Sequence, residues 1–88
     1  MILPIGDNSY MFWCAGCESV HIVDSRWILD ADTAAPTLTP SVLVQDQRGN
    51  VCHLHLSRGI VTYLADCTHA LKGTAIPLPD FPAWMSSR

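Results

Sequence analysis

The segment from 51 to 71, VCHLHLSRGIVTYLADCTHAL, constrains the fold more than any other part of the chain, because it reads as a β-hairpin with two different faces. Two runs of strand-forming residues, 51–57 and 60–66, are joined by Arg58-Gly59. A glycine in a two-residue connector supplies the positive φ that such a turn requires. The sequence therefore predicts a hairpin in which Ser57 pairs with Ile60.

This register sorts the hairpin side chains onto two faces, since side chains alternate along a strand. The first face is mostly apolar and carries both cysteines: Cys52, Leu54, Leu56, Val61, Tyr63, Ala65 and Cys67. The second face carries His53, His55, Ile60, Thr62, Leu64 and Asp66. A shift of one residue would exchange the faces. The hairpin thus predicts that Cys52 and Cys67 lie together, and that His53 lies near Asp66.

A second pair of cysteines has the Cys-x-x-Cys spacing of a zinc knuckle, in which two thiolates reach one ion at about 2.3 Å. Redox proteins share this spacing, but the sequence shows no βαβ unit in which a redox motif would start a helix. We predict a Zn²⁺ site, and four residues are the predicted ligands: Cys14, Cys17, Cys52 and Cys67. His69, or less directly His53, is the alternative to one hairpin cysteine. His21, four residues after Cys17, is a candidate ligand or a hydrogen-bond donor to one.

The histidines leave a catalytic alternative open. If one coordination position on the metal held water, a small zinc-dependent hydrolase could use His53, Asp66 and His69. If the metal were closed by four protein ligands, the site would be structural, and Asp66 would orient His53 or cap the following turn. The four cysteines favour the structural interpretation, under which the chain has no catalytic residues. His55 is interpreted as an ordinary residue.

Composition limits the remaining function classes. The chain has 88 residues, 49% of them hydrophobic, which indicates one zinc-binding domain spanning 1–88, with an N-terminal tail at 1–9 and a loose C-terminal tail at 82–88. The net charge is −3 and the five Lys and Arg are scattered, so nucleic-acid binding is not expected, although a nucleic-acid-binding zinc ribbon stays as a third interpretation. The sequence shows neither a signal peptide nor a membrane-spanning run, which favours the cytoplasm and metal over disulfides.

Outside the hairpin, the pattern is that of further short strands. We expect strands at 9–14, at 19–29 with a break near Asp24, and at 41–46, with a loop at 30–41 and little helix. The expected fold is therefore a small mostly-β domain, α+β at most. It would be a zinc-ribbon-like antiparallel sheet with a CxxC knuckle held against the hairpin.

Several short motifs together resemble a family of small proteins common in bacteriophage and prophage genomes, a zinc-binding domain family of unknown function (the DUF6527 type). These motifs are FWCAGCESVH, Trp27, PTLTPS, the Cys-His pair at 52–53, SRGIVTYLADCTHALKG and LPD at 78–80. They cover about Phe12 to Pro82. Here the knuckle reads CAGCE where the family has CPGCG. The family sometimes has Ser at the position of Cys67, which strengthens His69 as a ligand.

The resemblance and the composition lead to one functional expectation. The chain is predicted to be a phage-type viral accessory protein with a structural zinc site, located in the host cell cytoplasm. Its apolar surface would bind a protein partner of the host or the phage, such as a host defence or replication factor. A homo-oligomer is also compatible with that surface.

Overall fold

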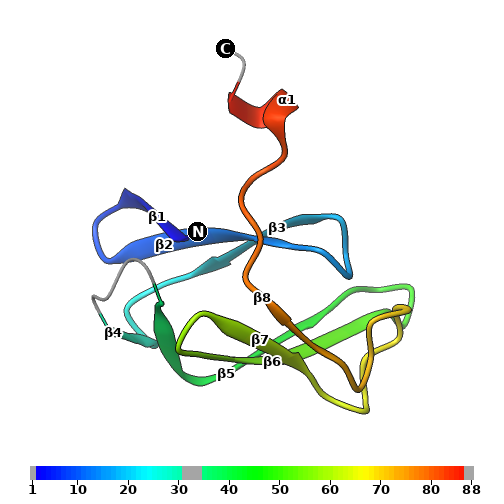
Figure 1. The fold of residues 1–88 in the computed structure, drawn as a ribbon. Coiled ribbons are helices and arrows are strands. Elements are labelled where there is room, and N and C mark those ends of the chain that lie inside the picture. Colours follow the sequence, from blue (N-terminus) through cyan, green and yellow to red (C-terminus); the bar gives the residue numbers. More distant parts are fainter. Residues whose placement is uncertain (1, 31–34, 87–88) are drawn as a thin grey trace.

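The computed structural model describes residues 2–30 and 35–86, which form two antiparallel sheets and one short helix (Figure 1). The first sheet has the order β1-β2-β3, with β1 at Ile2–Gly6, β2 at Ser9–Cys14 and β3 at Ser19–Val23. The second has the order β4-β5-β6-β7-β8, with β4 at Ile28–Asp30, β5 at Thr37–Gln45, β6 at Val51–Ser57, β7 at Ile60–Tyr63 and β8 at Ala75–Pro77. The helix α1 spans Ala83–Ser86. The prediction of a small mostly-β antiparallel fold is confirmed.

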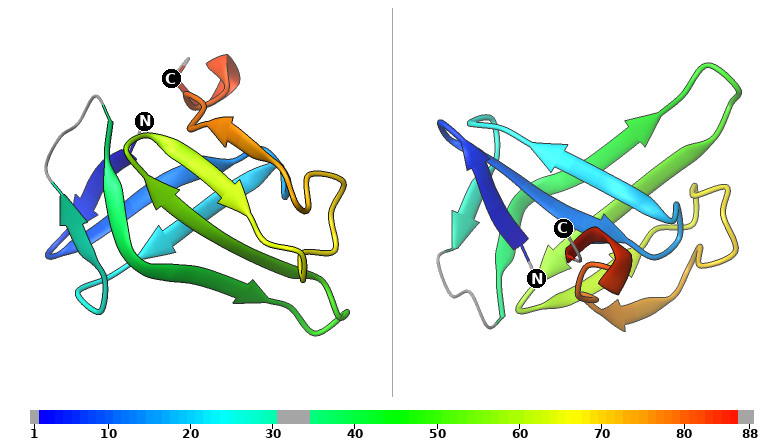
Figure 2. Two further views of the ribbon diagram at one scale, coloured as in Figure 1. Left: turned by 60° about the horizontal axis from the view of Figure 1, so that its bottom comes forward. Right: turned by 90° about the horizontal axis from the view of Figure 1, so that it is seen from above.

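The three-stranded sheet lies over one face of the five-stranded sheet, and the core fills the space between them (Figures 1 and 2). Phe12 and Val23 enter it from the first sheet, and Leu54, Leu56 and Tyr63 from the second. Burying an apolar side chain of this size contributes roughly 1.5–3 kcal/mol each. Three cysteines, Cys14, Cys52 and Cys67, are buried in the same core.

The predicted hairpin register is confirmed. Leu54 pairs with Tyr63, and Ser57 pairs with Ile60. Arg58 and Gly59 both have positive φ, 50° and 79°, as a two-residue turn of this kind requires. β7 ends at Tyr63, so the pairing does not continue to the cysteine end of the hairpin as a regular ladder.

Two terminal segments that the sequence predicts as tails adopt regular structure. Residues 2–6 form β1, which pairs with β2, because Ile2 contributes an apolar side chain that the core buries. Within 82–88, the short helix α1 places Trp84 edge-to-face against Trp13, with ring centroids 6.0 Å apart. Residues 87–88 lie outside the described part of the chain.

The predicted loop at 30–41 is wrong at its C-terminal end, because β5 begins at Thr37. Thr37 and Leu38 are strand-forming residues, and Leu38 is buried in the core, so the chain gains both packing and ladder hydrogen bonds there. The two prolines that suggested a loop precede or interrupt the strand without ending it. Residues 31–34 of the predicted loop lie outside the described residues.

β5 contains an irregularity directly before Val42, at the position of Ser41. Leu38 pairs with Leu56 and Val42 with Leu54, so four steps along β5 match two along β6. Such a bulge bends a strand and changes the direction of the side chains within it. Ser41 lies at the end of this bulge. β4 pairs with β5 over Thr37–Thr39, and beyond that point none of the described strands lies on the outer side of β5.

Candidate functional site

Three polar side chains from separate elements form a continuous hydrogen-bonded array. The Oγ of Ser41 lies 3.1 Å from Nε2 of His53. The other ring nitrogen of His53, Nδ1, lies 3.0 Å and 3.2 Å from the two carboxylate oxygens of Asp66. Ser41 comes from β5, His53 from β6, and Asp66 from the turn that follows β7. The predicted proximity of His53 and Asp66 is therefore found, and Ser41 completes the array.

The hydrogen-bond partners of His53 determine which ring nitrogen holds the proton. An ionised Asp66 carboxylate can only accept, so Nδ1 of His53 carries the hydrogen and donates it. In the neutral ring, Nε2 then has a free lone pair and accepts the hydroxyl hydrogen of Ser41. This is the arrangement in which a histidine acts as general base toward a serine hydroxyl.

The array lies on the face of the sheet that is turned away from the core. His53 and its neighbour in the alternation, His55, share that face, whereas Cys52 and Leu54 on the same strand are buried. The His53 side chain is 24% exposed, and that of Asp66 is 57% exposed. A ligand in solvent can therefore reach the serine and the histidine together.

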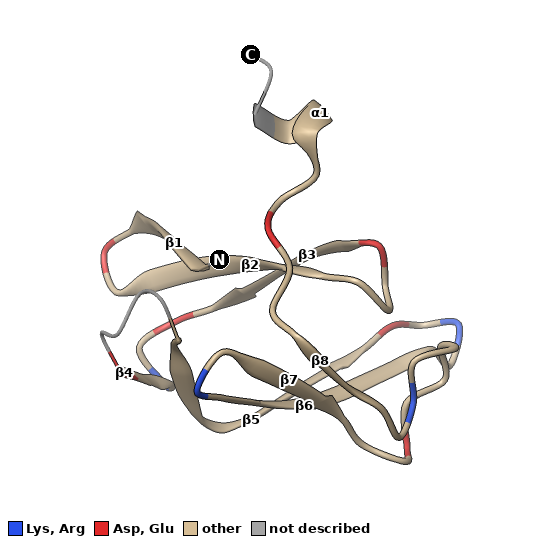
Figure 3. Ribbon diagram, viewed as in Figure 1, with Lys and Arg blue, Asp and Glu red and all other residues tan. Residues whose placement is uncertain are grey.

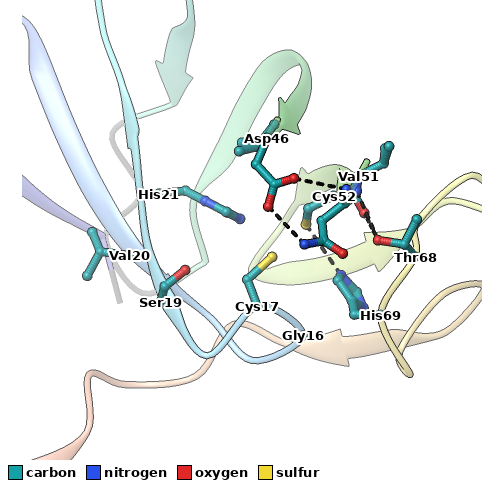
Figure 4. A pocket seen from close by; sticks show the side chains of 12 residues that line it. Gly16, Cys17, Ser19, Val20, His21, Asp46, Val51, Cys52, Thr68 and His69 are labelled. Carbon is teal, nitrogen blue, oxygen red and sulfur yellow. Dashed lines mark hydrogen bonds between the residues drawn. The ribbon is translucent and has the colours of Figure 1, made fainter. Parts of the chain in front are cut away.

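A second group of polar side chains lies on the core side of β6, where a hollow of about 440 Å³ opens between the first sheet and the hairpin (Figure 4). The ligand atoms of four residues here all lie within 4.8 Å of one another: Cys14, Cys17, His21 and Cys52. Cys14 ends β2, Cys17 lies within the turn that leads into β3, and His21 follows on β3. This group could hold a metal ion, and all four cysteines are free thiols.

The spacing within this group matches a tetrahedral thiolate site. Two sulfur atoms that are each about 2.3 Å from a tetrahedral ion lie about 3.8 Å apart. The Sγ atoms of Cys14 and Cys52 are 3.7 Å apart.

The electrostatics of the group favour one thiolate among protonated thiols when no metal is bound. The hydrogen bond from Cys52 is the largest of several that lower the pKa of Cys14 to about 3. Burial, followed by the nearby Cys14 charge, raises the pKa of Cys17 to about 11. The hydrogen bond to Cys14 and burial raise the pKa of Cys52 above its ordinary value. A metal ion that binds here would therefore displace protons from Cys17 and Cys52.

His21 supplies a separate indication that this group fits a metal. Its side chain is buried, with 5% exposed, and its Nε2 has no hydrogen-bond partner among the described residues. A buried polar atom without a partner is costly, and native structures rarely contain one without a reason. One ring nitrogen of His21 also lies within 4.8 Å of three cysteine sulfurs, so a metal bound in this group could be coordinated by the imidazole.

His69 reaches the same hollow but is bonded differently. Its Nε2 lies 3.4 Å from the Sγ of Cys52, and its Nδ1 accepts the backbone N–H of Leu71 at 3.2 Å. A neutral ring whose Nδ1 accepts must carry its hydrogen on Nε2, so that nitrogen donates to the sulfur. A histidine in this tautomer has no lone pair on Nε2 for a metal. Its hydrogen bond would instead stabilise the Cys52 thiolate that forms when a metal displaces the proton.

Cys67 also lies near Cys52, in a smaller group of possible metal-binding residues with His69. Its sulfur bonds the backbone of His53, accepting from the N–H at 3.2 Å and donating to the C=O at 3.1 Å. The structure thus brings three of the four predicted ligands together with His21. The fourth, Cys67, is placed against the backbone of the strand that carries His53.

The ring of His69 lies directly over Gly16, which gives a prediction. A Cβ at Gly16 would meet the ring atoms Cε1, Nε2 and Nδ1. We expect Gly16→Ala to displace His69 and to lower the free energy of unfolding by roughly 1–3 kcal/mol, as overpacking does. Thermal unfolding followed by circular dichroism measures this. Gly6→Ala is the matched control, because a Cβ there meets nothing within 4 Å, and equal stability of the two variants would contradict the prediction.

Sequence reasoning did not identify Ser41 as a functional residue. A serine after a proline matches no nucleophile motif, and the two residues that join it in the hydrogen-bonded array lie 12 and 25 positions further along the chain. The signal in the sequence that points to a nucleophile is the predicted His53–Asp66 pair. Such a pair activates a serine when one lies beside the histidine, for example on a neighbouring strand.

The two groups share a strand but not a face. Cys52 and His53 are consecutive on β6, so their side chains point to opposite sides of the sheet. The residues of the predicted zinc hydrolase are therefore divided: His53 and Asp66 join Ser41 on the outer face, and His69 contacts Cys52 on the inner face.

Fold and site together define a class: a small two-sheet β protein with a Ser-His-Asp hydrogen-bonded array outside and a cysteine-rich group inside. The model of one protein family, described as bacterial ubiquitination-like system serine protease (BubE), matches residues 2–64. The chain belongs to this family. The matched range contains Ser41 and His53 and ends two residues before Asp66. Neither the curated proteins nor the solved structures include a significant match.

Two further observations concern the molecular surface. Among the described residues, Lys and Arg lie on separate loops and turns and form no basic patch (Figure 3). The described helix is far too short to cross a membrane, and the described residues contain no candidate membrane span.

Proposed function

We propose that this chain is a serine peptidase of a bacterial ubiquitination-like system, with Ser41 as nucleophile, His53 as general base and Asp66 as the group that orients His53. The observation that carries the proposal is the array of Ser41, His53 and Asp66, in which both nitrogens of one imidazole are engaged as the chemistry requires. The family description, which names a serine protease, supports the same chemistry.

The proposed reaction uses each group in one role. Ser41 Oγ attacks the carbonyl carbon of the scissile bond while Nε2 of His53 takes its proton. The imidazolium formed is stabilised by the Asp66 carboxylate, which bonds Nδ1. His53 then gives the proton to the leaving amine, and the acyl-enzyme on Ser41 is released by water through the reverse sequence. This scheme requires a protein or peptide substrate, and the host or phage binding partner expected from composition stays a separate prediction.

The proposal also includes a structural zinc ion. Cys14, Cys17, Cys52 and His21 would hold it, since their ligand atoms are mutually close and His21 Nε2 otherwise lacks a partner. When bound, the ion would cross-link the β2–β3 turn to β6, and so fix the strand that carries His53. Cys67 and His69 would act outside the coordination shell, through the His53 backbone and the Cys52 sulfur. An origin in bacteriophage remains a prediction from the resemblance alone.

Covalent labelling tests the proposed nucleophile. An alkyl fluorophosphonate should phosphonylate Ser41 with one adduct per chain, because only an activated serine reacts readily with this reagent. Intact-mass spectrometry measures the stoichiometry, and peptide mapping locates the adduct. Adducts spread over several serines, or none at all, would contradict the proposal.

Asp66 gives a prediction that separates an orienting role from a structural one. Asp66→Asn offers an amide that can present N–H to Nδ1, which favours the histidine tautomer with its proton on Nε2. We expect the rate of fluorophosphonate labelling to fall by roughly 10²–10⁴-fold with little change in thermal stability. Asp24→Asn is the matched control, because among the described residues the Asp24 carboxylate bonds just the exposed Arg26. A labelling rate equal to wild type in Asp66→Asn would remove Asp66 from the proposed mechanism.

A further inference from the structure

The outer edge of β5 lies beside Ser41 and has a free row of backbone groups. β4 covers this edge only as far as Thr39, and β5 then continues to Gln45 as the outermost strand of its sheet, as the left view of Figure 2 shows. The residues beyond the nucleophile, Leu43 to Gln45, are exposed, Leu43 by 50% and Val44 by 37%.

The hydrogen bonds of β6 show which way the backbone of β5 points. Leu43 lies opposite His53, and His53 directs its N–H to the Cys67 sulfur and its C=O to the N–H of Leu64, both on the β7 side. Residues directly opposite each other in an antiparallel pair either bond each other twice or not at all. Because His53 bonds toward β7, the N–H and C=O of Leu43 must point outward, away from β6.

Backbone groups of Gln45 and Ser41, on either side of Leu43, also point outward. Gln45 lies opposite Val51, whose N–H and C=O bond Thr68 on the far side, so the backbone groups of Gln45 also point outward. At Ser41, the outward C=O is already occupied by the indole N–H of Trp27 at 3.2 Å. The free row therefore begins just past Ser41. Among the described residues, no protein group bonds the outward groups of Leu43 or Gln45.

Proteins usually protect such an edge, but no residue within 2–30 or 35–86 protects this one. Natural edge strands carry charges, prolines or covering loops that stop another chain from pairing with them. The stretch 41–45 reads SVLVQ, in which Leu43 to Gln45 are exposed and no residue is charged, and Figure 3 shows this part of β5 free of both signs of charge. An uncharged, exposed edge with outward N–H and C=O groups is the complement of an extended polypeptide backbone.

We propose that the substrate binds as an added β-strand on the outer edge of β5, where its main chain bonds Leu43 and Gln45 and its scissile bond lies at Ser41. The occupant is thus an extended, unfolded segment of polypeptide, recognised mainly by its backbone. An extended chain rises about 3.4 Å per residue, so the substrate residue paired with Leu43 lies about two residues from the bond that is cut. This inference rests on the proposed function, since it requires Ser41 to be the nucleophile.

The test compares two variants at one position. Leu43→Pro removes the outward N–H but no internal hydrogen bond, and Leu43→Ala keeps that N–H and removes only the side chain. The probe is a pool of internally quenched octapeptides of mixed sequence, and the alkyl fluorophosphonate reports Ser41 reactivity separately. We expect Leu43→Pro to lower kcat/KM on the peptides by about tenfold or more, and Leu43→Ala by less than about threefold, with equal fluorophosphonate labelling in both.

A second measurement keeps the inference testable if Leu43→Pro does not fold. The best peptide of the pool is resynthesised with single N-methyl groups on successive amides. Strand pairing predicts that N-methylation slows cleavage at every second position on one side of the cut bond and not at the positions between, since alternate N–H groups face the protein.

The outcomes separate this inference from the proposed function. Absence of fluorophosphonate labelling at Ser41 defeats the proposed function. A chain that is labelled at Ser41 but cleaves no peptide, or shows no alternation with N-methyl peptides, overturns the strand-addition proposal alone. A concentration-dependent dimer that Leu43→Pro converts to a monomer with unchanged peptide cleavage would assign the edge to a second copy of the chain and also overturn it.

Discussion

Ser41→Ala is expected to abolish covalent labelling by the fluorophosphonate and to reduce hydrolysis of peptide substrate by roughly 10⁴–10⁶-fold, down to the background rate. The reason is that His53 and Asp66 act only through the hydroxyl that they activate, which lies 3.1 Å from Nε2. Ser41 is only partly buried and its Oγ bonds no group other than His53 among the described residues, so the fold should persist. Peptide cleavage rates and circular dichroism measure the two parts of the result.

Ser9→Ala is the matched control for this experiment. Ser9 begins β2, and among the described residues its Oγ has one hydrogen-bond partner, the backbone C=O of Asp7. That variant should be labelled and should cleave peptide at the wild-type rate. Cleavage that survives in Ser41→Ala, with wild-type folding, would show that another group performs the chemistry.

Removal of the proposed metal is expected to have an equally large effect on stability. In small structural zinc sites the metal contributes about 10–16 kcal/mol of apparent binding free energy, which exceeds the roughly 5–15 kcal/mol net stability of an ordinary domain. We therefore expect a strong chelator, or Cys14→Ser, to unfold the chain cooperatively and to end labelling of Ser41 with it. Elemental analysis and circular dichroism during chelation measure the metal content and the unfolding.

Two comparisons identify the ligands and the role of this metal. Cys67→Ser should keep about one metal per chain, because Cys67 lies outside the group formed by Cys14, Cys17, His21 and Cys52. Replacement of the metal by Co²⁺ or Cd²⁺ should restore both the fold and Ser41 labelling, since the ion is proposed to take no part in the reaction. A folded, reactive chain with no bound metal would contradict the structural role.

The part of the fold that could be predicted from sequence is the part set by local chemistry. Arg58-Gly59 fixed the hairpin register, and alternation then separated Cys52 from His53 correctly. The edge strands were missed because their formation depends on what they meet: β1 forms because Ile2 has a core to enter and β2 to pair with. Thr37 likewise joins a strand because β4 and β6 lie on its two sides.

The candidate site divides in the same way. The spacing of Cys14 and Cys17 and the His53–Asp66 pair were accessible, since each depends on neighbours along one chain segment. Ser41 was not accessible, because the bulge in β5 that brings it beside His53 is a property of two paired strands. Sequence spacing could not show that His21 fits the metal group better than His69 does. That conclusion depends on the hydrogen bond from the Leu71 N–H to His69 Nδ1, which only the folded structure reveals.

The order of the three residues along the chain separates this protein from well-known serine hydrolases. Here the sequence runs serine, histidine, aspartate, at positions 41, 53 and 66. The α/β-hydrolases, chymotrypsin and subtilisin each use a different order on a different fold. Under the proposed chemistry the shared geometry is convergent, and residues 41 to 66, a stretch of 26 residues, supply all three side chains.

Consecutive placement of Cys52 and His53 also limits how the chain can change in length. Deleting or inserting one residue of β6 ahead of this pair would shift the register of the strand by one residue. Each following side chain would then lie on the opposite face of the sheet. The thiol would then face solvent, and the imidazole would face the core. Insertions and deletions in natural relatives should therefore lie in the turn at 46–50 and not in β6. The reason is that β6 supplies one residue to each group, Cys52 and His53, at consecutive positions.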